Sequence, residues 1–124
     1  MELSLSFRFV DDDINDKLIG LVKKARVKHA VDGRGIIHYS PADEEKVEND
    51  LIASLRNRLF ASWQVLSCPQ DWTELYKRYM SRHDIPFHEE LIGHEVCFLI
   101  PRKYRPSLWK LTAQKKHREI GIAR

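Results

Sequence analysis

The chain has 124 residues, 43% hydrophobic and 31% charged, which is the size and composition of a single globular domain with a buried core. This composition excludes a disordered chain, and a count of two cysteines excludes a scaffold held together by disulfides. The formal net charge of +3 is unevenly spread: residues 101–124 contain eight Lys and Arg against one Glu, or +7, while residues 1–100 amount to −4.

The first nine residues contain neither a basic segment nor an unbroken apolar segment, so they do not resemble a signal peptide. The longest apolar run, residues 96–100, is far too short to span a bilayer. We therefore predict a soluble, cytoplasmic protein without a membrane partner. In that reducing compartment Cys68 and Cys97, which form no Cys-x-x-Cys pattern, are expected to be buried free thiols.

The N-terminal segment predicts a strand followed by a helix. Residues 3–9 alternate between apolar side chains and Ser or Arg, the period of a half-buried strand. The acidic triplet 11–13 follows, and a carboxylate there caps a helix N-terminus; we favour this interpretation over a divalent-cation site. Apolar residues then recur at helical spacing, which predicts a helix over residues 11–27.

The next segment predicts a hairpin, a helix and a strand. Asp32-Gly33 lies between the β-prone residues 29–31 and 36–39, and Gly35 adds backbone freedom, so a β-hairpin is expected. Ser40-Pro41 has the pattern of an N-cap followed by the first helical position, and an apolar stripe continues to residue 60. A short strand over residues 63–66 follows.

Residues 2–67 thus have the order strand, helix, strand, strand, helix, strand. This order is typical of the ferredoxin-like βαββαβ core, and it places the chain in the α+β class. An α/β sandwich of different topology is the alternative.

An extension follows this core. Trp72, Tyr76, Tyr79 and Met80 share one helical face, which we interpret as core packing in preference to an aromatic recognition surface. Residues 87–91 and 95–100 predict a hairpin that either extends the sheet at one edge or covers its open face. We therefore expect one domain over residues 1–111, with a core at 2–67 and an extension at 70–111, followed by a basic tail at 112–124.

The basic C-terminus is the candidate for nucleic-acid binding. The aromatics by which RNA-recognition modules stack bases on a ferredoxin-like sheet are missing, since only Arg34-Gly35 matches the third-strand signature. A cationic segment with aromatic residues can still contact phosphates and stack bases. The candidate residues are Arg102, Lys103, Arg105, Trp109, Lys110, Lys115, Lys116 and Arg118. The alternative is a solvated terminus with Leu108, Trp109 and Leu111 docked on the domain.

Catalytic chemistry has weaker support. His83, His88, Glu90 and His94 are suitable ligand types for a metal, but their spacing differs from the His-Glu-x-x-His arrangement. Polar residues on the surface of a hairpin are the favoured alternative. No glycine-rich phosphate loop, nucleophile elbow or catalytic triad is found, so no catalytic residue and no cofactor are assigned.

These observations favour a non-catalytic binding module that engages a protein partner or self-associates. Such a module requires a defined apolar surface. Nucleic-acid binding through the basic C-terminus is the first alternative, and a metal-dependent enzyme is the second.

Overall fold

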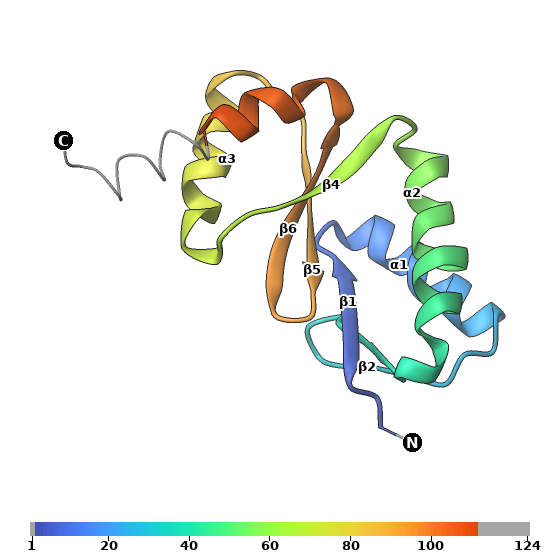
Figure 1. Ribbon diagram of the computed structural model, residues 1–124. Coiled ribbons are helices and arrows are strands. Elements are labelled where there is room, and N and C mark those ends of the chain that lie inside the picture. Colours follow the sequence, from blue (N-terminus) through green and yellow to red (C-terminus); the bar gives the residue numbers. More distant parts are fainter. Residues whose placement is uncertain (1, 112–124) are drawn as a thin grey trace.

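The structure is a computed structural model that describes residues 2–111, and it is an α+β protein built on a six-stranded antiparallel sheet (Figure 1). The strands are β1 (Leu5–Phe9), β2 (His29–Val31), β3 (Ile37–Tyr39), β4 (Trp63–Ser67), β5 (His88–Ile92) and β6 (Glu95–Pro101). The α-helices are α1 (Asp12–Lys24), α2 (Ala53–Leu59), α3 (Thr73–Arg82) and a final helix over residues 105–111. A π-helical segment, η2 (Lys46–Ile52), leads directly into α2. Single 3₁₀ turns lie at η1 (Pro41–Asp43), η3 (Gln70–Trp72) and η4 (Arg102–Tyr104).

The strand order corrects the predicted arrangement of the sheet. The element order of residues 2–67 is as expected, and β2, β3 and β1 are neighbours as in a ferredoxin-like sheet. In that fold β4 would pair with β1, whereas here the sheet runs β2-β3-β1-β5-β6-β4. The β5–β6 hairpin therefore lies inside the sheet, neither at its edge nor over its face. β4 remains antiparallel to β1 but is displaced by two strands.

The physical reason for this insertion is the apolar character of β6. Cys97, Phe98, Leu99 and Ile100 are consecutive and all buried, so both faces of the strand need cover. Only an interior strand of a sheet with helices on both sides meets that requirement. β4 has a buried residue only at Leu66 and occupies the edge.

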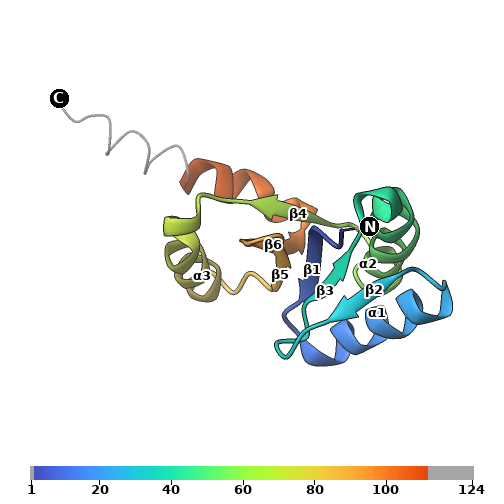
Figure 2. The same ribbon diagram turned by 90° about the horizontal axis from the view of Figure 1, so that it is seen from below.

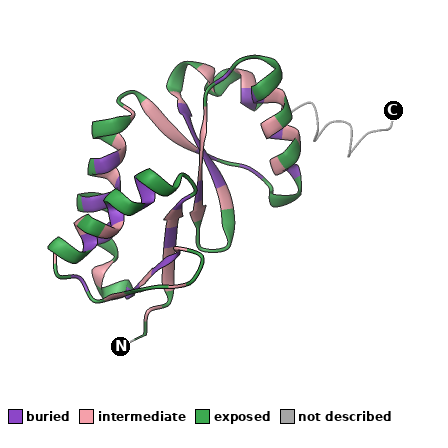
Figure 3. Cartoon of the chain, turned by 180° about the vertical axis from the view of Figure 1, so that it is seen from behind, coloured by how far each residue is buried: buried purple, intermediate pink, exposed green. Residues whose placement is uncertain are grey.

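Two apolar cores lie on opposite faces of the sheet. Phe7 and Phe9 of β1 pack with α1, η2 and α2, whereas Phe98 and Ile100 of β6 pack with α3 and Leu108 of the final helix. The strand registers place Phe9 beside Glu90 and Glu90 beside Cys97, so these side chains share the α2 face while the neighbouring Phe98 points the other way. Figure 2 shows the two helical groups on either side of the sheet, and Figure 3 shows the buried residues on the sides of the helices that face it.

The β2–β3 hairpin is confirmed. Of the two glycines in its turn, Gly35 has the left-handed conformation, with φ 78°, whereas Gly33 does not have a positive φ. A Cβ at Gly35 would lie 1.9 Å from a guanidinium nitrogen of Arg8, which donates to the Arg34 carbonyl. The buried Asn15 side chain accepts a hydrogen bond from Phe9 N–H and donates one to the Gly35 carbonyl. Asn15 thus connects α1, β1 and the hairpin loop.

The predicted helix caps are confirmed, but the second helix is not a regular α-helix. Asp11 accepts from Ile14 N–H at the start of α1, and Ser40 accepts from Ala42 N–H at the start of η1. In the following helix Ala53 N–H bonds to the Glu48 carbonyl, five residues back, which is the π-helical pattern. Among the described helices, none has the length and apolar character needed to cross a membrane.

Candidate functional site

The outer side of β4 is an unpaired sheet edge. β4 pairs with β6 on one side, and no strand within residues 2–111 pairs with its other side, which we call the β4 edge. Its sequence, Trp-Gln-Val-Leu-Ser, contains no charge, proline or glycine. Natural sheets usually protect an exposed edge with lysine, proline or a bulge, because free N–H and C=O groups invite pairing with another chain. β4 has none of these features.

The hydrogen-bond pattern identifies the backbone groups on the β4 edge. Arg102 N–H donates to the Ser62 carbonyl at 3.0 Å, which makes these two residues a hydrogen-bonded pair. Because such pairs alternate along antiparallel strands, Gln64 and Leu66 direct their backbone groups toward β6, and Val65 and Ser67 direct theirs outward. The outward N–H of Trp63 already donates to the Phe60 carbonyl at 3.0 Å. The N–H groups of Val65 and Ser67 therefore point away from the sheet.

Partly exposed apolar side chains flank this edge on the α2 face. Trp63 and Val65 are half-buried, and Trp63 lies beside Phe60 with ring centroids 5.0 Å apart. A shallow depression of about 490 Å³ opens at the start of β4. A smaller cleft of about 180 Å³ lies beside Val65, between the sheet and the helix formed by η2 and α2. The depression is lined by Ala61, Ser62, Trp63, Pro101, Arg102 and Lys103. The cleft is lined by Phe7, Tyr39, Glu48, Ile52, Arg56, Val65 and Ile92.

The π-helical turn provides the polar wall of the cleft. Tyr39 Oη donates to Glu48 Oε2 at 3.0 Å, and both burial and this carboxylate raise the pKa of the phenol above its usual range. π-helical turns are rare and are often found at functional sites. The phenol and the carboxylate already bond to each other, so the cleft offers mainly apolar surface to a ligand.

Arg56, which lines the cleft, also forms an ion pair with a buried residue of the sheet. Glu90 is fully buried, and the Arg56 guanidinium binds both carboxylate oxygens, with Nε–Oε2 at 3.0 Å and Nη2–Oε1 at 2.5 Å. The same guanidinium lies 5.7 Å from the centroid of the Phe7 ring. This bidentate pair connects α2 to β5.

The four candidate metal ligands are not brought together. Both oxygens of Glu90 bind Arg56, His88 packs against Phe60 with ring centroids 4.6 Å apart, and His83 lies beside Tyr79 at the end of α3. His94 lies in the β5–β6 turn. Over residues 2–111, no group of three or more His, Cys, Asp or Glu is placed to hold a metal ion.

Both cysteines are buried and free, as expected. Burial raises the pKa of the Cys68 thiol to about 11 and also raises the pKa of Cys97. Because the thiolate is the nucleophilic form, neither cysteine is activated for nucleophilic chemistry at neutral pH.

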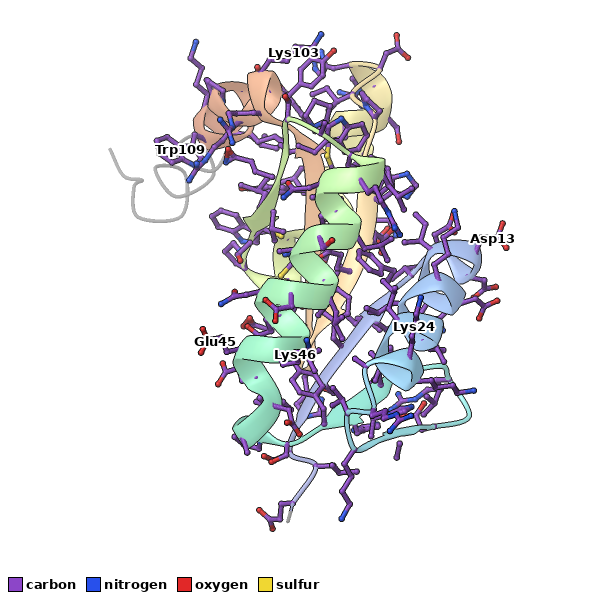
Figure 4. The ribbon with its side chains drawn as sticks, turned by 90° about the vertical axis from the view of Figure 1, so that its right-hand side faces the viewer. Asp13, Lys24, Glu45, Lys46, Lys103 and Trp109 are labelled. Atoms are coloured by element: carbon purple, nitrogen blue, oxygen red, sulfur yellow. The ribbon has the colours of Figure 1, made fainter. Side chains whose placement is uncertain are left out.

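Five of the candidate nucleic-acid-binding residues lie in the described part of the basic C-terminus, and all five are exposed. Arg102 and Lys103 belong to η4, and Arg105, Trp109 and Lys110 to the final helix. Figure 4 labels Lys103 and Trp109. Trp109 is 59% exposed and Arg105 lies over its ring at 4.7 Å. Leu108 is fully buried and Leu111 packs against the same core, so the alternative of a docked segment holds for these two residues and not for Trp109. Lys115, Lys116 and Arg118 lie outside the described residues.

Comparison of the chain with protein-family models, with curated proteins and with solved structures finds no match. The structure defines an α+β protein with a six-stranded antiparallel sheet and an unprotected edge at β4.

The β4 edge was missed from the sequence. The segment 63–66 was correctly predicted as a strand, but the assumed fold placed it beside β1. The missed signal was the contrast between β4 and residues 96–100: the apolar run belongs in the interior of a sheet, and the shorter, more polar strand belongs at its edge.

Proposed function

We propose that this protein is a non-catalytic binding module that captures an extended segment of a protein partner along the β4 edge. The observation that carries this proposal is the absence of charge, proline and glycine from β4, whose outer side pairs with no strand of residues 2–111. In strand addition, main-chain hydrogen bonds provide affinity, and pockets for alternate side chains provide specificity.

The surroundings of β4 suit such a ligand. An added strand would receive the outward N–H groups of Val65 and Ser67. Its alternate side chains would reach the depression beside Trp63 and the cleft beside Val65, both of which lie on the α2 face. An extended segment with apolar residues at every second position matches both requirements.

Selection from a displayed library of short random peptides tests this function, with the Val65→Pro variant as counter-target. Proline at an edge position removes an outward N–H and leaves the ladder to β6 in place. We expect enriched peptides to have apolar residues at alternate positions and to bind Val65→Pro at least about tenfold more weakly than the wild type. Peptides that bind both proteins equally would contradict the proposal.

A matched control is available at the other edge of the sheet. Asp32 N–H donates to the Ile36 carbonyl, so by the same alternation the Val31 N–H points away from β3. Val31→Pro removes an outward N–H from β2, and it should bind the selected peptides as the wild type does.

Nucleic-acid binding by the C-terminal helix is the second candidate. It is favoured by the 59% exposure of Trp109, with Arg105 stacked on its ring, in a segment where residues 101–111 contain four cations and no acidic residue. An exposed aromatic beside cations suits a single strand. Fluorescence anisotropy with labelled oligonucleotides at two salt concentrations should then show salt-sensitive binding that Trp109→Ala weakens. Binding unaffected by both salt and this substitution would exclude it.

A further inference from the structure

We propose that the strand bound at the β4 edge is β4 of a second copy of the chain, aligned antiparallel about a two-fold axis at Val65. This inference rests on the proposed function, because it uses the same edge. It joins two six-stranded sheets into one continuous sheet, a closed arrangement in which both copies use the same surface.

The backbone of β4 is complementary to itself in this register. Each Val65 N–H meets the Val65 carbonyl of the second copy, and each Ser67 N–H meets the Trp63 carbonyl of the other chain. The Trp63 N–H, which would face the Ser67 carbonyl of the second copy, already donates to the Phe60 carbonyl. The bonds donated by Val65 and Ser67 of both copies therefore form without a change in the fold of either copy.

The side chains also fit this register. Trp63 of one copy lies opposite Ser67 of the other, so a large ring faces a small, exposed side chain, and Val65 faces Val65. Pairs of β-branched residues directly opposite each other stabilise antiparallel strands. On the α2 face the apolar surfaces around the two Trp63 rings become continuous across the axis.

Charge favours the antiparallel direction. The chain around the start of β4 exposes Arg58, Arg102 and Lys103, whereas the segment after its end exposes Asp71 and Glu74, of which Glu74 also pairs with Lys77 at 3.6 Å. Antiparallel pairing places the basic start of one strand near the acidic region after the end of the other. Parallel pairing would place like charges together, and like charges that meet at an interface disfavour it.

Sedimentation velocity of the full-length chain tests the assembly. The wild type should form a dimer that Val65→Pro and Ser67→Pro each convert to monomer, whereas Val31→Pro on the opposite edge should remain dimeric. Ser67 is exposed, so its substitution removes an outward N–H with little loss of packing. Circular dichroism verifies that each variant is folded. A folded Ser67→Pro variant that dimerises like the wild type would overturn the proposal.

A charge exchange identifies the direction of pairing. Two double variants reverse the charge at one end of β4 each: Arg102→Glu/Lys103→Glu at its start and Asp71→Lys/Glu74→Lys after its end. Each variant places like charges at both ends of its own homodimer, so each alone should dimerise at least about tenfold more weakly than the wild type. An equimolar mixture restores opposite charges at both ends and should form a heterodimer. Variants that each dimerise alone as strongly as the wild type would exclude the antiparallel arrangement.

The outcomes separate this inference from the proposed function. A wild type that remains monomeric, but binds peptides in a manner abolished by Val65→Pro, would refute self-pairing and leave strand addition supported. A wild type that neither dimerises nor selects peptides dependent on the β4 edge would refute both.

Discussion

At the residue scale, the Arg56–Glu90 pair is the most consequential interaction for stability. Glu90 has no exposed surface, and its only described side-chain partner is Arg56, which itself lies at the wall of the cleft. Taking a carboxylate out of water costs several kcal/mol unless a partner compensates it. Removal of Arg56 therefore leaves the buried carboxylate of Glu90 without a counter-ion.

We expect Arg56→Ala to lower the free energy of unfolding by about 3–5 kcal/mol, because it leaves Glu90 buried without its counter-ion. Arg58→Ala, two residues along the same helix and exposed, should change it by no more than about 0.5 kcal/mol. Guanidinium denaturation of both variants measures the difference. Equal stability of the two variants would show that Glu90 finds another partner.

A second residue-scale prediction concerns acid sensitivity. Asp32 Oδ1 accepts from Arg34 N–H and Ile36 N–H, and Oδ2 lies 3.0 Å from His38 Nε2. The hydrogen bond from His38 and those from the two backbone amides lower the pKa of Asp32 from 3.8 to about 2. A lowered folded-state pKa stabilises the protein above the unfolded value, and this contribution is lost as the pH falls through the folded value.

The stability difference between the wild type and Asp32→Asn should accordingly shrink as the pH falls from about 4 to about 2. Urea unfolding at a series of pH values measures it. Asp16→Asn, at an exposed position of α1, serves as the control. A difference that stays constant down to pH 2 would contradict the assigned role of the carboxylate.

At the element scale, the strands differ in how firmly their backbones are held. β6 pairs on both sides, with β5 and β4, whereas β4 pairs with β6 alone among the strands of residues 2–111. Amide hydrogen exchange reports this difference residue by residue, because unbonded amides exchange without any opening of the sheet.

In the monomer, the amides of Val65 and Ser67 should exchange fast, and those of Gln64 and Leu66 slowly. Two-dimensional NMR after transfer to deuterated water resolves the four signals. Raising the protein concentration into the dimeric range should slow Val65 and Ser67 selectively. Equal protection of all four amides at every concentration would show that the alternation along β4 is wrong.

At the scale of the whole molecule, the second core depends on the C-terminal helix. Leu108 is fully buried among residues of β4, α3 and β6, whereas the adjacent Trp109 faces outward. We expect Leu108→Ala to cost about 2–5 kcal/mol of unfolding free energy. Trp109→Ala should cost less than about 1 kcal/mol despite removing the larger side chain. Thermal and denaturant unfolding of both variants compares the two positions; the reverse ranking would mean that the helix docks through its other face.

The local structure was largely determined by the sequence, because short-range signals specify it. The acidic cap at Asp11, the Ser40-Pro41 helix start, the hairpin around Asp32 and the stripe of Trp72, Tyr76 and Met80 were all predicted, and each depends on residues close in the chain. The π-helical turn was not predicted, since the apolar spacing around Val47 and Leu51 fits an ordinary helix equally well.

Only the tertiary structure decided which strands are neighbours. Local propensity cannot distinguish β4 beside β1 from β4 beside β6, because both arrangements satisfy the same period along the strand. The choice depends on covering both faces of the apolar β6 and on the Arg56–Glu90 pair, which joins residues 34 positions apart. The same choice leaves Trp63–Ser67 at the edge, where its free backbone becomes the candidate binding site.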